Sequence, residues 1–521
     1  MLHIIDSDLW LRPSVDVDRV PIHRRQSMKG CVMVANHPVV VIGAGPVGLA
    51  AAAELTERGL PVLVLERGAT AGAAVVEWGH VRLFSMWRDL VDPAAEKLLT
   101  ATGWRRPGDE GYPTGREWVD SYLTPLADAL GERVRFGVEV TGVSRLGRDR
   151  VVDAGREEQP FTVRVRGDAG EERLLARAVV DASGTWGSPS PLGGDGLPAL
   201  GEEAATERIS HRIPDLSDEG TRIRHAGRVT AVVGSGHSAL TALVSLAALA
   251  EENPGTKAVW VLRRGQVGDA FGGGADDQLA ARGALGQRAK AAVEAGHVEV
   301  VTGFRTAEVR PDAGRLVLVG EGGRALEPVD EAVALTGFRP DLSFLSEVRL
   351  GLDSTLQAPV ELAPLIDPNV HSCGTVYPHG AKELSHPEEG FFLAGMKSYG
   401  RAPTFLALTG YEQARSVAAH LAGDHEGAAR VELTLPETGV CGGSGLFEEP
   451  EAEAGSAGCC GTVPEAVEEP ATGQGGCCGG LAVSEVPVLS LDDNRTASSE
   501  SGCCTDASPQ KTELAEPNRI S

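Results

Sequence analysis

Three glycines early in the chain have the residue type and the spacing that bind phosphate groups. Gly43, Gly45 and Gly48 follow the apolar run Val39–Ile42, and an alanine-rich stretch comes directly after them. In a strand–turn–helix unit the first glycine permits a tight turn, the second lets the backbone approach a pyrophosphate, and the third lets the helix pack against the strand. The free amides at the start of the helix then face the phosphate charge. The spacing therefore predicts a dinucleotide site.

The same pattern returns later in the chain, with small residues at matching positions: Gly234, Gly236, Ser238 and Ala239. The two copies differ at the end of the apolar run that follows each of them. The first copy has Glu66 there, and a carboxylate at this distance accepts a hydrogen bond from a ribose 2′-hydroxyl. The second copy has Arg263 and Arg264, and arginine accommodates a 2′-phosphate. The sequence therefore predicts FAD at the first site and NADPH at the second, unless the two arginines are ordinary surface charges.

Both motifs require parallel strands and helices to position them. We therefore predict an α/β fold with two Rossmann-like dinucleotide-binding domains, one for FAD and one for NADP, plus a disordered C-terminal tail. The expected order is an N-terminal extension (1–37), the first part of the FAD domain (38–224), the NAD(P) domain (225–341), the second part of the FAD domain (342–423) and the tail (424–521).

Composition limits the partners. The net charge of −25 argues against nucleic acid or an anionic membrane, so we expect neither as a partner. No apolar run approaches the roughly 20 residues needed to span a bilayer. The first residues lack the apolar stretch of a secretory signal. We therefore expect a cytoplasmic protein with a small-molecule substrate, and a homodimer is left open.

The predicted tail holds most of the cysteines. It carries 18 acidic against 4 basic residues, and such a segment buries too little surface to offset its ordering entropy. Its thiols are a single cysteine and three adjacent pairs: Cys441, Cys459, Cys460, Cys477, Cys478, Cys503 and Cys504. Thiolates select soft ions, so the pairs could bind a trivalent metalloid or a metal. A redox relay, and no specific role, are the two alternatives.

With these motifs placed, residues 38–423 resemble the two-dinucleotide-binding flavoproteins, which include flavin-containing monooxygenases and thioredoxin-reductase-like enzymes. Two runs, 75–85 and 371–403, look like actinobacterial flavoproteins often encoded in arsenic-resistance operons. The resemblance implies FAD, NADPH and a trivalent arsenical as the substrate.

The resemblance also implies a set of cofactor-binding residues. The ADP part of FAD would be held by Gly43, Gly45, Gly48, Glu66 and Arg67, with Ser183 and Gly184 passing close to it. NADPH would be held by Gly234, Gly236, Ser238, Ala239, Arg263 and Arg264. Gly395 would lie near the ribityl chain, where relatives continue with aspartate and this chain has Met396. Lys397, Tyr399 and Arg401 follow, and could polarise the flavin or bind a substrate, or merely cap the last helix. No catalytic side chain is identified.

Two departures from the family pattern bear on the reaction. No Cys-x-x-Cys or Cys-x4-Cys accompanies either glycine motif, so the disulfide relay of the reductases is missing. The Phe-x-Gly-x-x-x-His fingerprint of flavin monooxygenases is absent as well, and residues 210–215 occupy that region.

The predicted function is an FAD- and NADPH-dependent oxidoreductase, a flavin monooxygenase acting in arsenic resistance. Hydride would pass from NADPH to FAD, oxygen activation would follow, and the tail cysteine pairs would bind the metalloid. One alternative is an NADPH-dependent disulfide or metal reductase that uses the tail dithiols. The other is a metalloid-binding chaperone or sensor with a flavoprotein core.

Overall fold

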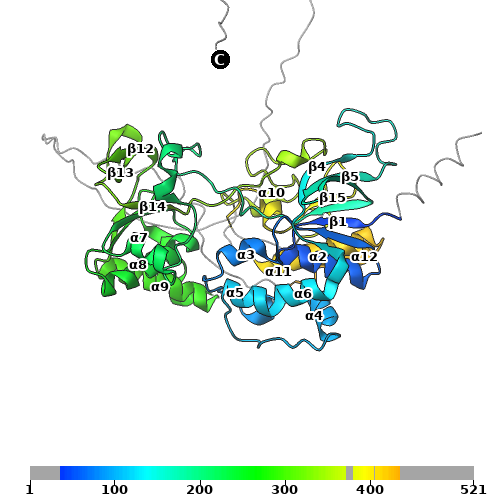
Figure 1. The fold of residues 1–521 in the computed structure, drawn as a ribbon, viewed down its shortest axis with the longest axis horizontal. Coiled ribbons are helices and arrows are strands. Elements are labelled where there is room, and N and C mark those ends of the chain that lie inside the picture. Colours follow the sequence, from blue (N-terminus) through cyan, green and yellow to red (C-terminus); the bar gives the residue numbers. More distant parts are fainter. Residues whose placement is uncertain (1–35, 278, 371–378, 404, 434–521) are drawn as a thin grey trace, which may run out of the picture. The chain divides into compact units, whose positions relative to one another are not determined.

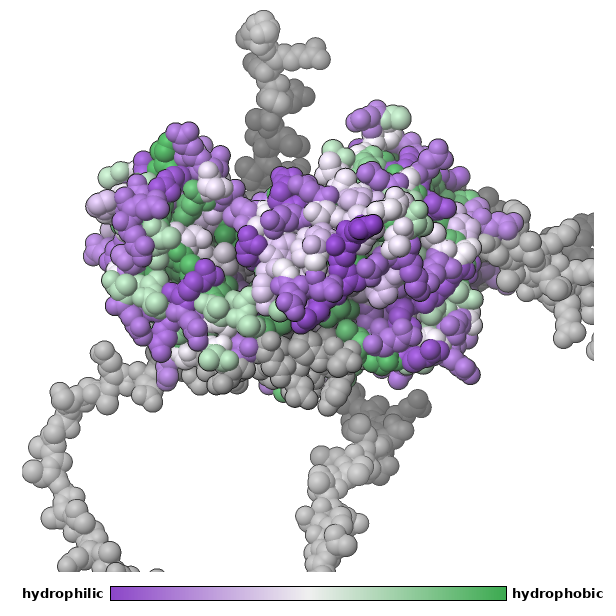
Figure 2. Space-filling model, turned by 90° about the horizontal axis from the view of Figure 1, so that it is seen from below, coloured by the Kyte–Doolittle hydropathy of each residue, from purple (hydrophilic) through white to green (hydrophobic). Residues whose placement is uncertain are grey.

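The computed structural model describes residues 36–277, 279–370, 379–403 and 405–433. All of these lie in one compact unit, Met1–Glu453. Its two main sheets are both parallel and each carries helices (Figure 1). On the face drawn in Figure 2, hydrophilic residues predominate and apolar ones form small patches. No helix within the described ranges is long and apolar enough to cross a membrane.

The first sheet is built around the strand that leads into the first glycine motif. Its order is β15 (Phe391–Leu393), β7 (Ala178–Asp181), β1 (Val39–Ile42), β2 (Val62–Leu65) and β3 (Val134–Arg135), and every neighbouring pair is parallel. Strands β1 and β7 are buried along their whole length. Continuous apolar runs are typical of parallel strands that are covered on both faces.

Helices α2 (Pro46–Glu57) and α11 (Ala407–Leu421) pack against each other beside this sheet. Most of α2 is buried, and its alanines let it approach its neighbours closely. The other helices of this half that precede α11 in the chain are short: α3 (Ala73–Glu77), α4 (Pro93–Thr100), α5 (Gly115–Trp118), α6 (Thr124–Leu130) and α10 (Ala363–Ile366).

The second sheet repeats the design around the second glycine motif. Its order is β11 (Val298–Val301), β10 (Lys257–Val261), β9 (Val229–Val233), β14 (Glu331–Ala334) and β8 (Ile209–Ser210), again parallel throughout. Its helices are α7 (Glu219–His225), α8 (His237–Glu252) and α9 (Ala280–Glu294). Because β8 already belongs to this sheet, the second sheet begins ahead of the predicted boundary at residue 225.

Two antiparallel sheets accompany the parallel ones. The larger contains β4 (Glu139–Arg145), β5 (Phe161–Gly167) and β6 (Gly170–Ala176), and the smaller contains β12 (Thr306–Asp312) and β13 (Arg315–Gly320). The larger shares a core with the first parallel sheet. Glu388, just before β15, lies 2.8 Å from Arg145 Nε and 2.6 Å from Arg156 Nη2, and these buried ion pairs hold the two sheets together.

The predicted α/β fold with two Rossmann-like domains is confirmed. Ordered structure continues past residue 423, where the tail was predicted to begin. There α12 (His425–Ala429) starts with Asp424 accepting a hydrogen bond from the Gly427 amide at 2.8 Å. Ser416 of α11 donates a hydrogen bond to Ala428 O at 2.6 Å, so the end of α11 supports this turn. The rest of the predicted tail, from residue 434, lies outside the described residues.

Candidate cofactor-binding site

The first glycine motif lies at the carboxyl end of β1, and each of its glycines has a different environment. Gly43 has φ +99°, and a Cβ there would lie 2.9 Å from Ser183 Cα, in the turn that follows β7. A Cβ on Gly48 would overlap the Gly43 carbonyl oxygen. A Cβ on Gly45 would meet nothing within 4 Å, so this position faces open space. The motif thus forms a cradle that a side chain at Gly45 would fill, which fits a closely approaching pyrophosphate.

The first turn of helix α2 presents backbone amides without a capping side chain to that space. Its N-cap Gly45 makes no side-chain hydrogen bond, and its first turn has no acidic residue. The amides of this turn therefore keep their capacity to bind an anion, and the helix dipole adds partial positive charge.

Glu66 joins the motif to the loop after β2. Its Oε2 accepts a hydrogen bond from the Ala44 amide at 2.7 Å, and its Oε1 accepts one from the Gly68 amide at 2.7 Å. The residue is 9% exposed. Each carboxylate oxygen has two acceptor positions, so the second on each oxygen is left for ribose hydroxyls.

The other predicted FAD residues converge on the same strand edge. Arg67 lies against Gly187, where a Cβ would come within 2.8 Å of its Nη2. Gly184 has φ +71°, and Gly395 has φ +70° and faces Val47 in the first turn of α2. The Gly395 amide donates to Gln413 Oε1 at 2.7 Å. The structure therefore gathers the whole predicted set at the carboxyl ends of β1, β2, β7 and β15, as parallel sheets that bind ligands do.

The main feature that the sequence did not predict here is a buried ion pair. Lys397 Nζ lies 2.7 Å from Asp181 Oδ2, and the two side chains are 1% and 0% exposed. Lys397 also donates to Ser183 Oγ at 3.0 Å. Asp181 Oδ1 accepts hydrogen bonds from the Ser183 hydroxyl, at 2.6 Å, and from the Ser183 amide, at 3.1 Å. The lysine thus holds the turn on which Gly43 packs, a role outside both predictions for it.

Three further residues of that region have separate places. Tyr399 is buried, and its ring lies edge-on to Phe405 at 5.0 Å between centroids. Arg401 is exposed and donates to Gln357 Oε1 at 2.8 Å. His379 is buried, with its Nε2 at 2.9 Å from Gln413 Nε2.

The second glycine motif reproduces the first in detail. Gly234 has φ +135°, and a Cβ there would overlap Leu335 O, in the segment after β14. A Cβ on Gly236 would meet nothing within 4 Å, and Gly236 caps α8 without a side-chain hydrogen bond. Ala239 is fully buried, and Ser238 is exposed. This geometry fits a second dinucleotide.

The predicted NADPH arginines lie at the end of β10. Arg263 Nη1 donates to Gly194 O at 3.4 Å. Arg263 is exposed, but partial desolvation by its surroundings lowers the pKa of its guanidinium, and the charges of Arg305 and Arg264 lower it further. Neither predicted arginine forms an ion pair within the part of the chain that the structure describes. The assignment of the individual cofactor-binding residues stays a prediction.

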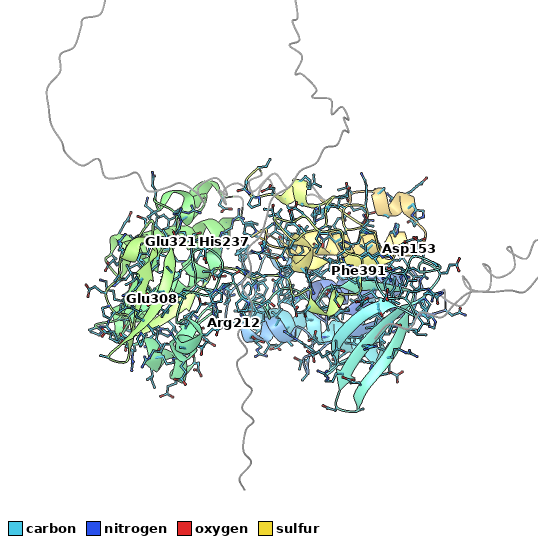
Figure 3. All side chains as sticks on the ribbon, turned by 90° about the horizontal axis from the view of Figure 1, so that it is seen from above. Asp153, Arg212, His237, Glu308, Glu321 and Phe391 are labelled. Carbon is cyan, nitrogen blue, oxygen red and sulfur yellow. The ribbon has the colours of Figure 1, made fainter. Side chains whose placement is uncertain are left out.

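Aromatic residues gather where the chain crosses between the two sheets. Trp186, after β7, and Phe338, after β14, have ring centroids 5.0 Å apart. The guanidinium of Arg212, which is labelled in Figure 3, lies 3.8 Å from the centroid of the Trp186 ring. Glu77, at the end of α3, accepts a bond of 2.7 Å from the Trp186 indole and lies 3.6 Å from Arg212 Nε. The segment after β7 and the segment after β14, which connect the two parallel sheets, are therefore held together by the contacts of Trp186, Phe338 and Arg212.

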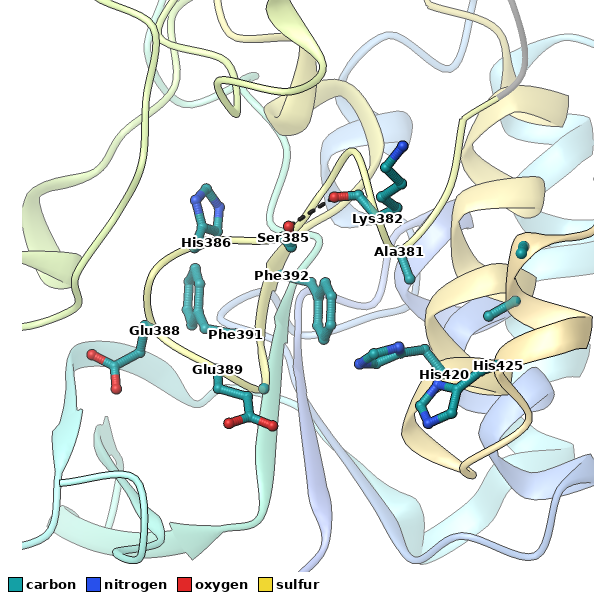
Figure 4. Close-up of a pocket in the computed structure, with 13 residues that line it drawn as sticks. Ala381, Lys382, Ser385, His386, Glu388, Glu389, Phe391, Phe392, His420 and His425 are labelled. Carbon is teal, nitrogen blue, oxygen red and sulfur yellow. Dashed lines mark hydrogen bonds between the residues drawn. The ribbon is translucent and has the colours of Figure 1, made fainter. Parts of the chain in front are cut away.

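A separate cavity of about 410 Å³ lies at the other end of the first sheet (Figure 4). Its wall includes Phe391, Phe392 and Glu389 from the amino end of β15, and His420 and His425, whose rings are 5.2 Å apart. Because the glycine motif lies at the carboxyl ends of the strands, this cavity is not the predicted FAD site.

No metal centre is found in the described ranges, where no group of three or more His, Cys, Asp or Glu could hold an ion. The predicted metal-binding thiols all lie outside the described residues: Cys441, Cys459, Cys460, Cys477, Cys478, Cys503 and Cys504. His371 and Cys373 lie outside them as well.

Two parallel sheets, each with a glycine turn at its central strand, define a two-dinucleotide-binding flavoprotein. Residues 40–361 match the family model described as pyridine nucleotide-disulphide oxidoreductase, and the chain belongs to this family. The membership confirms the predicted class, a flavin-dependent oxidoreductase.

Individual relatives are similar over parts of the chain. Indole-3-pyruvate monooxygenase YUCCA1 of rice (Oryza sativa subsp. japonica) is 30% identical over 209 residues, which cover 40% of this chain and 44% of the rice protein. The structure of bacillithiol disulfide reductase Bdr (YpdA) from Bacillus cereus is 20% identical, with a TM-score of 0.55, and covers 74% of this chain and 99% of its own. FAD-bound DfoA, the cadaverine monooxygenase of desferrioxamine biosynthesis from Erwinia amylovora, is 17% identical, with a TM-score of 0.53, and covers 77% and 98%. These two structures share the fold.

Proposed function

We propose that this chain is an FAD- and NADPH-dependent monooxygenase of the cytoplasm that acts in arsenic resistance and oxidises a trivalent arsenical with oxygen. One observation favours oxygen, rather than a protein disulfide, as the electron acceptor. No cysteine occurs between residues 32 and 372, the stretch that contains both glycine motifs. A dithiol that received electrons beside the flavin would need two cysteines there, so the core offers no internal disulfide relay.

The residues that would bind FAD have defined tasks. The first turn of α2 faces the pyrophosphate with free amides, and Gly45 leaves room for its close approach. Glu66 holds the ribose while it fixes two loops. Lys397 and Asp181 keep the Ser183 turn packed on Gly43. When bound, FAD supplies the electron transfer and the reactivity toward oxygen, and the protein supplies binding and orientation.

The choice of NADPH is supported by charge. Arg263 and Arg264 follow β10, the strand next to the one that leads into the second motif. Guanidinium groups bind phosphate through forked, charge-assisted hydrogen bonds. Two adjacent arginines without an acidic partner in the described structure therefore favour a nucleotide with a 2′-phosphate.

The arsenical is supported by the cysteine pairs. Three adjacent Cys-Cys pairs at positions 459/460, 477/478 and 503/504 offer soft ligands in a chain otherwise poor in cysteine. We propose that these thiols bind the trivalent metalloid and raise its concentration near the flavin. The likeness of two sequence runs to flavoproteins of arsenic-resistance operons points the same way.

The test is NADPH oxidation by the FAD-loaded chain, with and without arsenite, in air and under nitrogen. Stimulation by arsenite that occurs in air and disappears under nitrogen is the expected result. Stimulation that persists under nitrogen, and that is lost when the six paired cysteines are changed to serine, would instead support the dithiol reductase. Tight arsenite binding without NADPH oxidation would support a metalloid chaperone or sensor.

A further inference from the structure

The loop after β11 is hydrogen-bonded to the end of β10. The Gly303 amide donates to Arg264 O at 2.7 Å, and the Phe304 amide donates to Leu262 O at 2.9 Å. These bonds fix the loop after β11 against the end of β10. Arg305 is therefore placed beside Arg263 and Arg264, which follow β10. All three lie at the carboxyl edge of the sheet, where ligands of parallel α/β sheets bind.

Gly194, in the segment between β7 and β8, contacts both Arg263 and Arg305. Arg263 Nη1 donates to Gly194 O at 3.4 Å. A Cβ on Gly194 would lie 2.7 Å from Arg305 Cβ, and the Gly194 amide donates to Thr306 O at 2.8 Å. Arg263 and Arg305 therefore lie against the same short stretch of backbone, and a larger residue at 194 would push Arg305 away.

The three positive charges are not neutralised by the described part of the protein. Arg264 and Arg305 are half-buried, and no side-chain hydrogen bond or ion pair is formed by either within that part. Asp195, the residue after Gly194, is acidic, but its Oδ1 accepts a hydrogen bond from the Leu197 amide at 2.9 Å. Like charges placed together repel, and a bound anion relieves the repulsion. Arg263 is exposed, so the three guanidinium groups are open to a ligand from solvent, whereas the buried Arg145 and Arg156 are paired with a carboxylate.

We propose that Arg305 completes a three-arginine site for the 2′-phosphate of NADPH, together with Arg263 and Arg264, and contributes to a preference for NADPH over NADH. The inference rests on the proposed use of a nicotinamide dinucleotide at the second glycine motif. A 2′-phosphate has three acceptor oxygens and close to two negative charges, so it can engage three guanidinium groups. The 2′-hydroxyl of NADH would leave them unpaired.

The experiment compares 2′,5′-ADP with 5′-AMP, because the two probes differ in the 2′-phosphate alone. Their dissociation constants are measured by calorimetry on the full, FAD-loaded chain. Arg305→Ala is expected to weaken 2′,5′-ADP binding about 10- to 100-fold, the range for a lost hydrogen bond to a charged group, and to leave 5′-AMP binding within about twofold. Arg305→Lys should retain part of the preference, because it keeps the charge but loses the fork.

Arg310→Ala is the matched control, since Arg310 is an exposed arginine of β12 that pairs with Glu308 at 2.7 Å. It should change neither constant. Should Arg305→Ala fail to retain FAD, Arg305→Gln supplies the same comparison with a side chain of similar length.

The outcomes distinguish the use of NADPH from the role of Arg305. A wild-type chain that binds 2′,5′-ADP no better than 5′-AMP would contradict the use of NADPH itself. A wild-type chain that prefers 2′,5′-ADP, together with an Arg305→Ala variant that prefers it equally, would overturn the role of Arg305 and leave NADPH in place.

Discussion

The Lys397 ammonium and the Asp181 carboxylate form an ion pair of 2.7 Å inside the protein, with the side chains 1% and 0% exposed. The pair joins the last residue of β7 to the segment after β15. Through Ser183 it reaches the turn that packs on Gly43. Loss of one partner of a buried pair leaves an uncompensated charge, whereas replacement of both is often neutral.

Lys397→Met is therefore expected to lower the free energy of unfolding by about 3–5 kcal/mol, and the double variant Asp181→Asn, Lys397→Met to recover part of that loss. Urea unfolding of the FAD-free chain measures both. Lys290→Met is the control, because Lys290 is exposed and lies 4.0 Å from Glu294, and its effect should stay below about 1 kcal/mol. Equal losses in the free energy of unfolding for the two methionine variants would show that the buried pair stabilises the fold no more than an exposed pair does.

Two glycines of the first motif should respond differently to alanine. At Gly45 a methyl group meets no protein atom, so the apo chain should keep its stability or gain up to about 1 kcal/mol. FAD affinity should fall about 10- to 100-fold, because the methyl group occupies the space of the approaching pyrophosphate. Fluorescence titration of the apo chain with FAD, alongside its urea unfolding, measures the two quantities.

Gly48→Ala provides the contrast. Its methyl group would overlap the Gly43 carbonyl oxygen, so the apo chain should lose about 1–3 kcal/mol of stability even without FAD. If Gly45→Ala bound FAD as tightly as the wild type, the cradle at the start of α2 would not be the pyrophosphate site.

The sequence predicted the parts of the site that depend on local spacing. The glycine turns and Glu66 lie within single strand–turn–helix–strand units, so short-range geometry positions them. The pairing of Lys397 with Asp181 joins segments far apart in the chain, so it depends on how β15 and β7 align. A single aspartate at the end of the apolar run Ala178–Asp181 was the available signal. The grouping of Arg305 with Arg263 depends likewise on contacts between separate strands.

The placement of β8 was missed for a similar reason. Ile209–Ser210 is too short to give a strand pattern, and its membership of the second sheet comes from its pairing with Ala332 and Val333. The helix α12 is also short, and it is stabilised by contacts from α11 that the sequence does not reveal.

Asp92 should make stability depend on pH. Its side chain is buried, and burial together with the charge of Glu54 raises the pKa of its carboxyl from 3.8 to about 8. The folded chain therefore binds more protons than the unfolded chain between these values, and stability falls as the pH rises from about 4 to about 8. The slope has an upper limit of about 1.4 kcal/mol per pH unit for one group.

Asp92→Asn should flatten that dependence, because asparagine can still accept from the Ala95 amide and cap α4. Thermal unfolding at pH 5 and pH 8 measures it. Asp218→Asn alters an exposed cap of α7, which accepts from the Thr221 amide at 2.8 Å, and should leave the pH profile as it is. An unchanged profile in Asp92→Asn would assign the dependence to other groups.

The central claim is that electrons pass from NADPH through the flavin to oxygen without a protein thiol. It is tested most directly by changing all nine cysteines to serine and measuring NADPH and oxygen consumption with saturating arsenite. The account predicts that kcat is retained within about twofold, while the KM for arsenite rises because the tail no longer binds it. Loss of turnover at saturating arsenite, in a variant that still binds FAD, would contradict the account and identify a thiol as the electron carrier.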